Sequence, residues 1–113
     1  MSYTVNESKT YNRAAEAVIK SAIEAISQLG GSQSKKSKPE AGRLEANFNK
    51  KIGSQPLNNR IQLEVSVTSQ SAEQCTISVV GYPVDPVGQK LMFGVRGQPA
   101  RTVIDAFLGR LEA

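Results

Sequence analysis

Residues 61–82 read IQLEVSVTSQSAEQCTISVVGY and contain two stretches in which apolar and polar side chains alternate. The apolar side chains are Ile61, Leu63, Val65 and Val67 in the first stretch and Cys75, Ile77 and Val79 in the second. Successive side chains of a strand point to opposite faces of a sheet, so each stretch is predicted to be a strand with one apolar face. The residues between them, 69–74, are mostly polar and form the expected turn. We therefore predict a central β-hairpin whose apolar face the rest of the chain covers.

Two segments repeat apolar residues at helical spacing and are expected to cover that face. The first is predicted to begin near Ser8 and to end at the pair Gly30-Gly31, because glycine adopts the left-handed conformation at a helix C-terminus at little cost. The second is predicted to begin at Pro99, since proline is tolerated at the first helical position. Its apolar side chains lie four residues apart, at Val103, Phe107 and Leu111.

Three further segments complete the predicted sheet. They are a short strand at 2–6, a strand at 43–52, and a short strand or core-bound apolar loop at 91–95. In the segment 43–52, the residues expected to face the core are Leu44, Ala46, Phe48 and Ile52. The order β-α-β-β-β-β-α predicts an α+β fold, with an antiparallel sheet of four to five strands and two helices packed on one face. Residues 1–113 are expected to form a single domain.

The composition is typical of a folded domain with few groups suited to catalysis. Apolar residues make up 39% and charged residues 21% of the chain, which indicates a folded protein rather than a disordered one. Histidine, the commonest general base and metal ligand, is absent. We therefore expect a non-enzymatic domain that holds no cofactor and no metal.

The single cysteine and the absence of targeting signals bear on the compartment. One cysteine excludes an internal disulfide, and the position of Cys75 in the inner row predicts a buried, unreactive thiol. The first residues show no secretory signal, and no stretch is long and apolar enough to span a bilayer. These observations predict a cytoplasmic protein without membrane contact.

Positive charge is concentrated in residues 31–60. Seven basic and two acidic residues lie there, whereas the remainder of the chain has seven basic and eight acidic residues. The candidate contacts for an anion or a nucleic acid are Lys35, Lys36, Lys38, Arg43, Lys50 and Lys51. Such a region could follow a phosphate backbone, where each neutralised phosphate releases counterions. The alternative is that lysine-rich strand edges only prevent aggregation and keep the domain soluble.

A second candidate anion site lies where the closing helix begins. Residues 94–97 read GVRG, and Arg96 and Arg101 flank the amide groups that open this helix. Free amides at a helix N-terminus attract anions. A flexible turn into the helix explains the glycines equally well, because short glycine motifs are frequent by chance.

The layout resembles small helix-grip or TBP-like domains, which include uncharacterised bacterial families and repeats of outer-membrane assembly lipoproteins. The features that carry the resemblance are the alanine-rich first helix ending at Gly30-Gly31, the turn at Ala41-Gly42 and the pair Phe93-Gly94 before the closing helix. The resemblance implies an α+β fold and transfers no functional residue. The lipoprotein relatives carry a lipidated cysteine after a signal peptide, and this sequence shows neither.

Three functional hypotheses follow. The leading one is a binding domain that recognises a protein partner or a second copy of itself. The first alternative is binding of nucleic acid or another polyanion through the basic hairpin region 35–51. The second is binding of a small ligand between the sheet and the helices.

Overall fold

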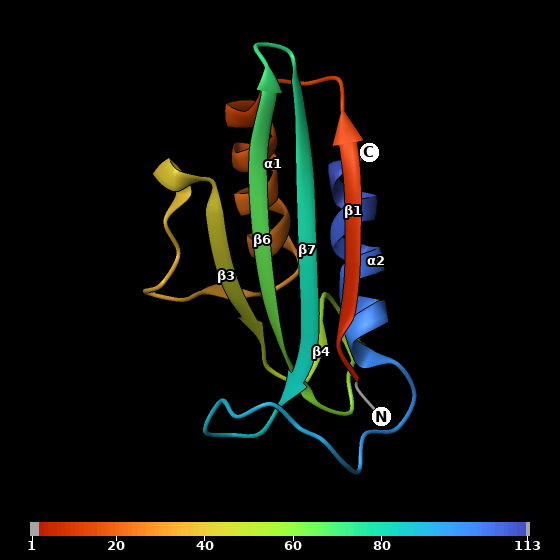
Figure 1. Ribbon diagram of the computed structural model, residues 1–113. Helices are drawn as coiled ribbons and strands as arrows, with labels where there is room; N and C mark the ends of the chain where they lie inside the picture. The colour runs from red at the N-terminus through yellow and green to blue at the C-terminus, as the bar shows by residue number, and fades with distance from the viewer. Residues whose placement is uncertain (1–2, 113) are drawn as a thin grey trace.

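The computed structural model describes residues 3–112, and it confirms the predicted α+β class. The main sheet has five antiparallel strands in the order β1-β7-β6-β3-β2. These strands are β1 (Val5–Tyr11), β2 (Ser32–Gln33), β3 (Arg43–Phe48), β6 (Arg60–Ser71) and β7 (Gln74–Val84). Helices α1 (Ala15–Gln28) and α2 (Pro99–Leu111) lie side by side behind the sheet in Figure 1.

Two short elements lie outside the main sheet. A second, two-stranded sheet pairs β4 (Lys51–Ile52) with β5 (Gln55–Pro56), and a 3-10 helix spans Pro39–Ala41. Neither α1 nor α2 is long and apolar enough to cross a membrane.

The central hairpin predicted from residues 61–82 is strands β6 and β7, which pair with Val65 opposite Val79. Its inner row packs against both helices and is buried. The largest fully buried side chains include Phe48, Phe107, Ile61 and Ile104. Burial raises the pKa of the Cys75 thiol, so this cysteine stays protonated and serves as a packing residue, as the sequence predicts.

The first helix begins at Ala15, about two turns later than predicted, because residues 5–11 form strand β1. This strand pairs with β7 along its whole length, from Val5 opposite Gly81 to Tyr11 opposite Cys75. Ser8, expected to cap the helix, instead faces the outer side of the sheet and hydrogen-bonds Ser78 across the strands at 3.1 Å. Strand pairing outweighs the capping preference of this side chain.

The predicted end of α1 at Gly30-Gly31 is confirmed. The Gly31 amide donates to the carbonyl of Ile26 at 2.8 Å, the Gly30 amide donates to Ser27 at 3.1 Å, and Gly30 has φ of +86°. These two bonds form a Schellman motif, which satisfies carbonyl groups that the last helical turn leaves unpaired.

The strand predicted at 43–52 is interrupted after Phe48. Lys50 adopts a left-handed conformation with φ of +59°, and the chain then forms the β4–β5 hairpin. Ile52 still reaches the core, and the Gly53 amide donates to the carbonyl of Leu29 at 2.7 Å. The small hairpin therefore closes the end of α1 instead of extending the main sheet.

The turn predicted at Ala41-Gly42 is present and requires glycine. Gly42 has φ of +75°, and a Cβ atom at this position would lie 2.5 Å from the carbonyl oxygen of Val67. The Gly42 carbonyl also accepts a hydrogen bond from the Val67 amide at 2.8 Å. Only a residue without a side chain allows this close approach to β6.

Residues 85–98 form a loop between β7 and α2 (Figure 1). The expectation that the apolar residues at 91–95 form a strand or pack on the core is wrong for Phe93, whose relative exposure is 84%. Only an isolated bridge between Val84 and Lys90 continues the sheet into this loop.

Candidate functional site

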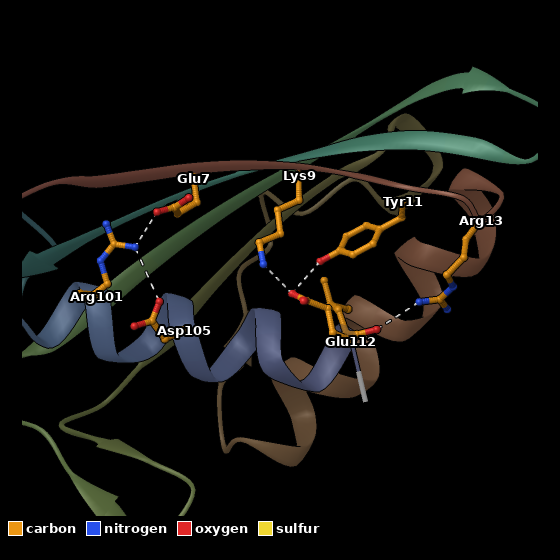
Figure 2. A network of polar contacts seen from close by, with 8 residues as sticks. Glu7, Lys9, Tyr11, Arg13, Arg101, Asp105 and Glu112 are labelled. Atoms are coloured by element: carbon orange, nitrogen blue, oxygen red, sulfur yellow. Dashed lines mark hydrogen bonds and ion pairs between the residues drawn. The ribbon is translucent and has the colours of Figure 1, made fainter.

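Strand β1 points charged side chains inward, toward α2. The pairing of Lys9 with Ile77 and of Tyr11 with Cys75 places Glu7, Lys9 and Tyr11 on the helix side of the sheet. Figure 2 shows them reaching toward α2, where Lys9 pairs with Glu112 at 2.8 Å. We call this row of contacts between β1 and α2 the seam.

At the other end of the seam, Arg101 of α2 contacts two carboxylates. Its Nη1 atom lies 2.6 Å from Glu7 and 3.6 Å from Asp105, one helical turn further along α2 (Figure 2). The hydrogen bond from Arg101 to Glu7 raises the pKa of the guanidinium above its usual value. Arg101 is therefore compensated within the chain, and its predicted role as an anion contact has little support from this arrangement.

The seam fixes the protonation of the groups near the end of β1. The hydrogen bond from Lys9 lowers the pKa of the Glu112 carboxyl and raises that of the Lys9 ammonium. Burial, reinforced by the nearby Glu112 charge, raises the pKa of Tyr11 to about 12. Tyr11 therefore remains a hydrogen-bond donor at neutral pH, and it donates to Glu112 at 3.3 Å.

Where β1 ends, the helices and the strand enclose a groove of about 710 Å³, which we call the seam groove. The side chains that shape it come from the end of β1, the middle of α1 and the last turn of α2. They include Tyr11, Arg13, Ser21, Gln28, Arg110 and Glu112. Segments distant in sequence thus meet at one polar hollow beside the core.

Two arginines line the seam groove, Arg13 just before α1 and Arg110 in the last turn of α2. Arg13 donates to the Ser21 hydroxyl at 2.7 Å. It also donates to the Leu111 carbonyl at 3.3 Å, the contact dashed from Arg13 in Figure 2, which ties the start of α1 to the end of α2. Arg110 donates to the Gln28 side chain at 3.1 Å. A guanidinium has five N–H donors, so these bonds leave both arginines able to donate to a ligand.

The seam groove lies at the edge of the helix layer, because the space directly between the sheet and the helices is filled. Phe48, Phe107 and Ile104 are fully buried there, and no polar or charged side chain of residues 3–112 is buried in the core. A close-packed interior of this kind has no room for a ligand. The pocket expected between the sheet and the helices is therefore not seen among residues 3–112, and the hollow at the seam lies at the edge of the helix layer.

The structure divides the predicted basic site into two parts. Lys35, Lys36, Lys38 and Arg43 line one hollow of about 640 Å³ on the outer face of the sheet. Lys50 and Lys51 lie outside it, and Lys50 lines a separate hollow of about 160 Å³ together with Arg60 and Asp85.

The larger basic hollow is not uniformly positive. Glu45 and Glu64 lie directly opposite each other on β3 and β6 and also line it. Like charges placed opposite each other across strands repel, and both would repel an anion that entered the hollow. The formal charge of the lining residues is thus reduced from four to two, which lowers the attraction expected from the sequence.

The other predicted arginine, Arg96, is exposed, and its carbonyl accepts a weak hydrogen bond from Asn58 at 3.4 Å. The neighbouring Gly94 and Gly97 have φ of +75° and +68°. These values favour the interpretation of the glycines as turn residues, because left-handed backbone is where glycine is needed.

The sequence alone did not indicate Tyr11, Arg13 or Arg110 as site residues. Residues 8–14 were expected to be helical, which would have directed these side chains differently. The available signal was the spacing of Val5, Glu7, Lys9 and Tyr11, a period-two row that contains two charges. A strand whose inner positions carry charged residues lacks the alternation of apolar and polar residues by which strands are predicted.

No protein-family model and no curated protein matches the sequence. Solved structures do match in fold. The two-domain aromatase/cyclase BexL of the BE-7585A biosynthetic pathway superposes with a TM-score of 0.57 at 11% identity, over 96% of this chain and 44% of that protein. This chain therefore spans less than half of BexL.

Two shorter proteins match over most of their length. The ZhuI aromatase/cyclase from Streptomyces sp. R1128 gives a TM-score of 0.51 at 10% identity, over 96% of this chain and 86% of that one. A protein from Thermobifida fusca, solved by NMR, gives 0.50 at 13% identity over 96% and 85%. At these identities the likeness shows a shared fold, which fits the resemblance in layout seen in the sequence.

The matches correct the expectation of a non-enzymatic domain. BexL and ZhuI are aromatase/cyclases, so this arrangement of sheet and helices is one that enzymes use. The expectation depended on the absence of histidine, which is not sufficient to exclude catalysis. Tyrosine and arginine donors can also stabilise developing charge on a substrate oxygen.

Proposed function

We propose that this domain binds a small polar molecule in the seam groove. The observation that carries the proposal is the groove itself, a hollow of about 710 Å³ lined by polar side chains from three elements beside a closed apolar core. Its volume lies within the range of known small-molecule sites. The fold shared with the aromatase/cyclases BexL and ZhuI supports a small organic ligand rather than a macromolecule.

The groove side chains indicate the chemical class of the ligand. Arg13 and Arg110 offer charged donors suited to a carboxylate. The Tyr11 hydroxyl donates its proton to Glu112, so toward a ligand it offers an acceptor oxygen. Glu24 and Glu112 line the same groove and can accept from a hydroxyl or amino group. A small hydroxy or keto acid matches this combination. A carbonyl group placed near Arg13 would be polarised by its guanidinium.

The test is an NMR titration of the ¹⁵N-labelled protein with a panel of small hydroxy and keto acids. We expect saturable shifts of the amides around residues 11–13, 21–28 and 110–112. Arg110→Gln should weaken binding by about 10- to 150-fold, since a charge-assisted hydrogen bond contributes about 1.5–3 kcal/mol. Arg110 is exposed at the end of α2, so this variant should fold normally.

Lys51→Gln is the matched control, because it removes an exposed cation that does not line the seam groove. It should bind like the parent protein. Equal affinity of the Arg110→Gln and Lys51→Gln variants, or shifts confined to other surfaces, would contradict the proposal.

A further inference from the structure

The exposed large apolar side chains of residues 3–112 are confined to one loop. They are Val87, Met92 and Phe93, with relative exposures of 82%, 55% and 84%. Single exposed apolar residues are ordinary on a protein surface, but three within seven residues of one loop indicate an interaction site. The loop is also long, at residues 85–98, and loops of this length are often functional.

Hydrogen bonds hold the first part of this loop in a defined shape. The Asp85 carboxylate accepts from the amides of Val87 and Gln89, both at 2.9 Å. Backbone bonds from Gly88 to Asp85 and from Asp85 to Gln89, also at 2.9 Å, close the same turn. Val87 is therefore presented at the tip of an ordered turn and does not fold back onto the core.

The base of the loop is attached to the sheet. The Leu91 amide donates to the carbonyl of Pro83 at 2.9 Å, and Lys90 lies over the ring of Tyr82 with its Nζ atom 4.6 Å from the ring centre. Asn58 bonds the Arg96 carbonyl, which joins the second part of the loop to the segment before β6. In Figure 1 the loop projects beyond the lower end of the sheet.

Four basic residues lie in this loop or beside it. Lys90 and Arg96 belong to the loop, and Lys50 and Arg60 line the hollow that Pro86 and Leu91 share with them. Among residues 3–112, the ion pairs involve only seam residues, so these four cations have no acidic partner. One oxygen of the nearby Asp85 carboxylate accepts from backbone amides, and its negative charge leaves this end of the molecule with four positive charges against one.

We propose that this end of the molecule, residues 85–98 with Lys50 and Arg60, docks on an anionic lipid surface. Apolar tips enter the boundary between head groups and acyl chains, while the surrounding cations remain among the anionic head groups. A second copy of the chain is a poor cover for this surface, because it would bring the same positive charge. Apolar side chains that project from a loop can enter a fluid lipid surface without matching pockets, whereas a protein partner would need a pocket for each of them.

The test is co-sedimentation of the protein with vesicles of phosphatidylcholine alone or mixed with phosphatidylglycerol. We expect binding to the mixed vesicles at low salt and weaker binding at high salt, since salt screens exposed charges. The double variant Met92→Ser and Phe93→Ser should lose roughly tenfold or more in affinity, because two large apolar side chains no longer leave water. Its circular dichroism should match that of the parent protein.

Lys90→Gln with Arg96→Gln should reduce binding to mixed vesicles, whereas Lys20→Gln, on the exposed face of α1, is the matched control and should not. Unchanged binding of the serine variant, or equal binding to neutral and anionic vesicles, would overturn the proposal. So would a concentration-dependent dimer that the serine variant abolishes, because a second copy would then cover the loop.

Discussion

The seam between β1 and α2 and the loop at 85–98 both contain cations. The cations of the seam have acidic partners in the described part of the chain, whereas those of the loop do not. In the seam, Lys9 lies 2.8 Å from Glu112, and Arg101 lies 2.6 Å from Glu7. In the loop, Lys90 and Arg96 take part in no ion pair with residues 3–112 and lie near exposed apolar side chains.

This difference separates charges that serve the fold from charges available to a partner. The inward charges of β1 pair with residues of the segment 101–112, so they help to align α2 with the strand and make the sheet edge unsuitable for pairing with another strand. In the loop, the Lys90 ammonium lies over the Tyr82 ring, and neither Lys90 nor Arg96 forms an ion pair with residues 3–112. Their placement is explained by a ligand that the domain meets from outside.

The largest effect is expected from detaching α2, on which both regions depend. Phe107→Ala should lower the free energy of unfolding by about 3–5 kcal/mol, because Phe107 is fully buried between α2 and the sheet. Chemical denaturation followed by circular dichroism measures this loss. Gly109→Ala is the control on the same helix and should raise the free energy of unfolding by about 0.5–1 kcal/mol, since nothing lies within 4 Å of the added carbon. A Phe107→Ala variant as stable as the parent would contradict the helix packing.

The parts of the fold that the sequence predicted are those in which local pattern and tertiary role agree. The alternation at Ile61–Val79 matches the buried row of β6 and β7, and Gly30-Gly31 forms the helix end that glycine favours. Each of these depends on one strong local preference. The α+β class and the approximate order of elements follow from them.

The candidate site was not predictable because its contacts join residues far apart in sequence. Arg13 meets Leu111 and Lys9 meets Glu112, pairs separated by about one hundred positions. Strand β1 itself was partly hidden, because Glu7 and Lys9 occupy inner positions where apolar residues are expected. The charge count at 31–60 was correct, but it could not show that Glu45 and Glu64 would lie among the lysines.

The Lys9–Glu112 pair of the seam is expected to make an intermediate contribution to the free energy of unfolding, and this contribution is lost at low pH. The folded-state pKa of Glu112 is lowered below its ordinary 4.5 by the hydrogen bond from Lys9, so the pair stabilises the fold fully above that value and loses its contribution as pH falls through the lowered pKa. Urea denaturation of the parent and of Glu112→Gln should therefore differ at neutral pH and converge in acid. Glu16→Gln, which removes an exposed carboxylate from α1, serves as the control. A gap between parent and Glu112→Gln that widens on acidification would contradict the role of this pair.

The smallest change in the free energy of unfolding is expected from substitutions in the loop, because its side chains, unlike those of the seam, make few contacts with the rest of the domain. Phe93 is 84% exposed, so Phe93→Ala removes almost no buried surface and should change the free energy of unfolding by less than about 0.5 kcal/mol. Thermal and urea denaturation measure this change, with Phe107→Ala as the buried phenylalanine for comparison. A loss near that of Phe107 would mean that the loop packs on the domain. Near-zero loss means that the aromatic ring contributes nothing to folding, which is the result expected of a side chain that is available to the anionic lipid surface proposed for this loop.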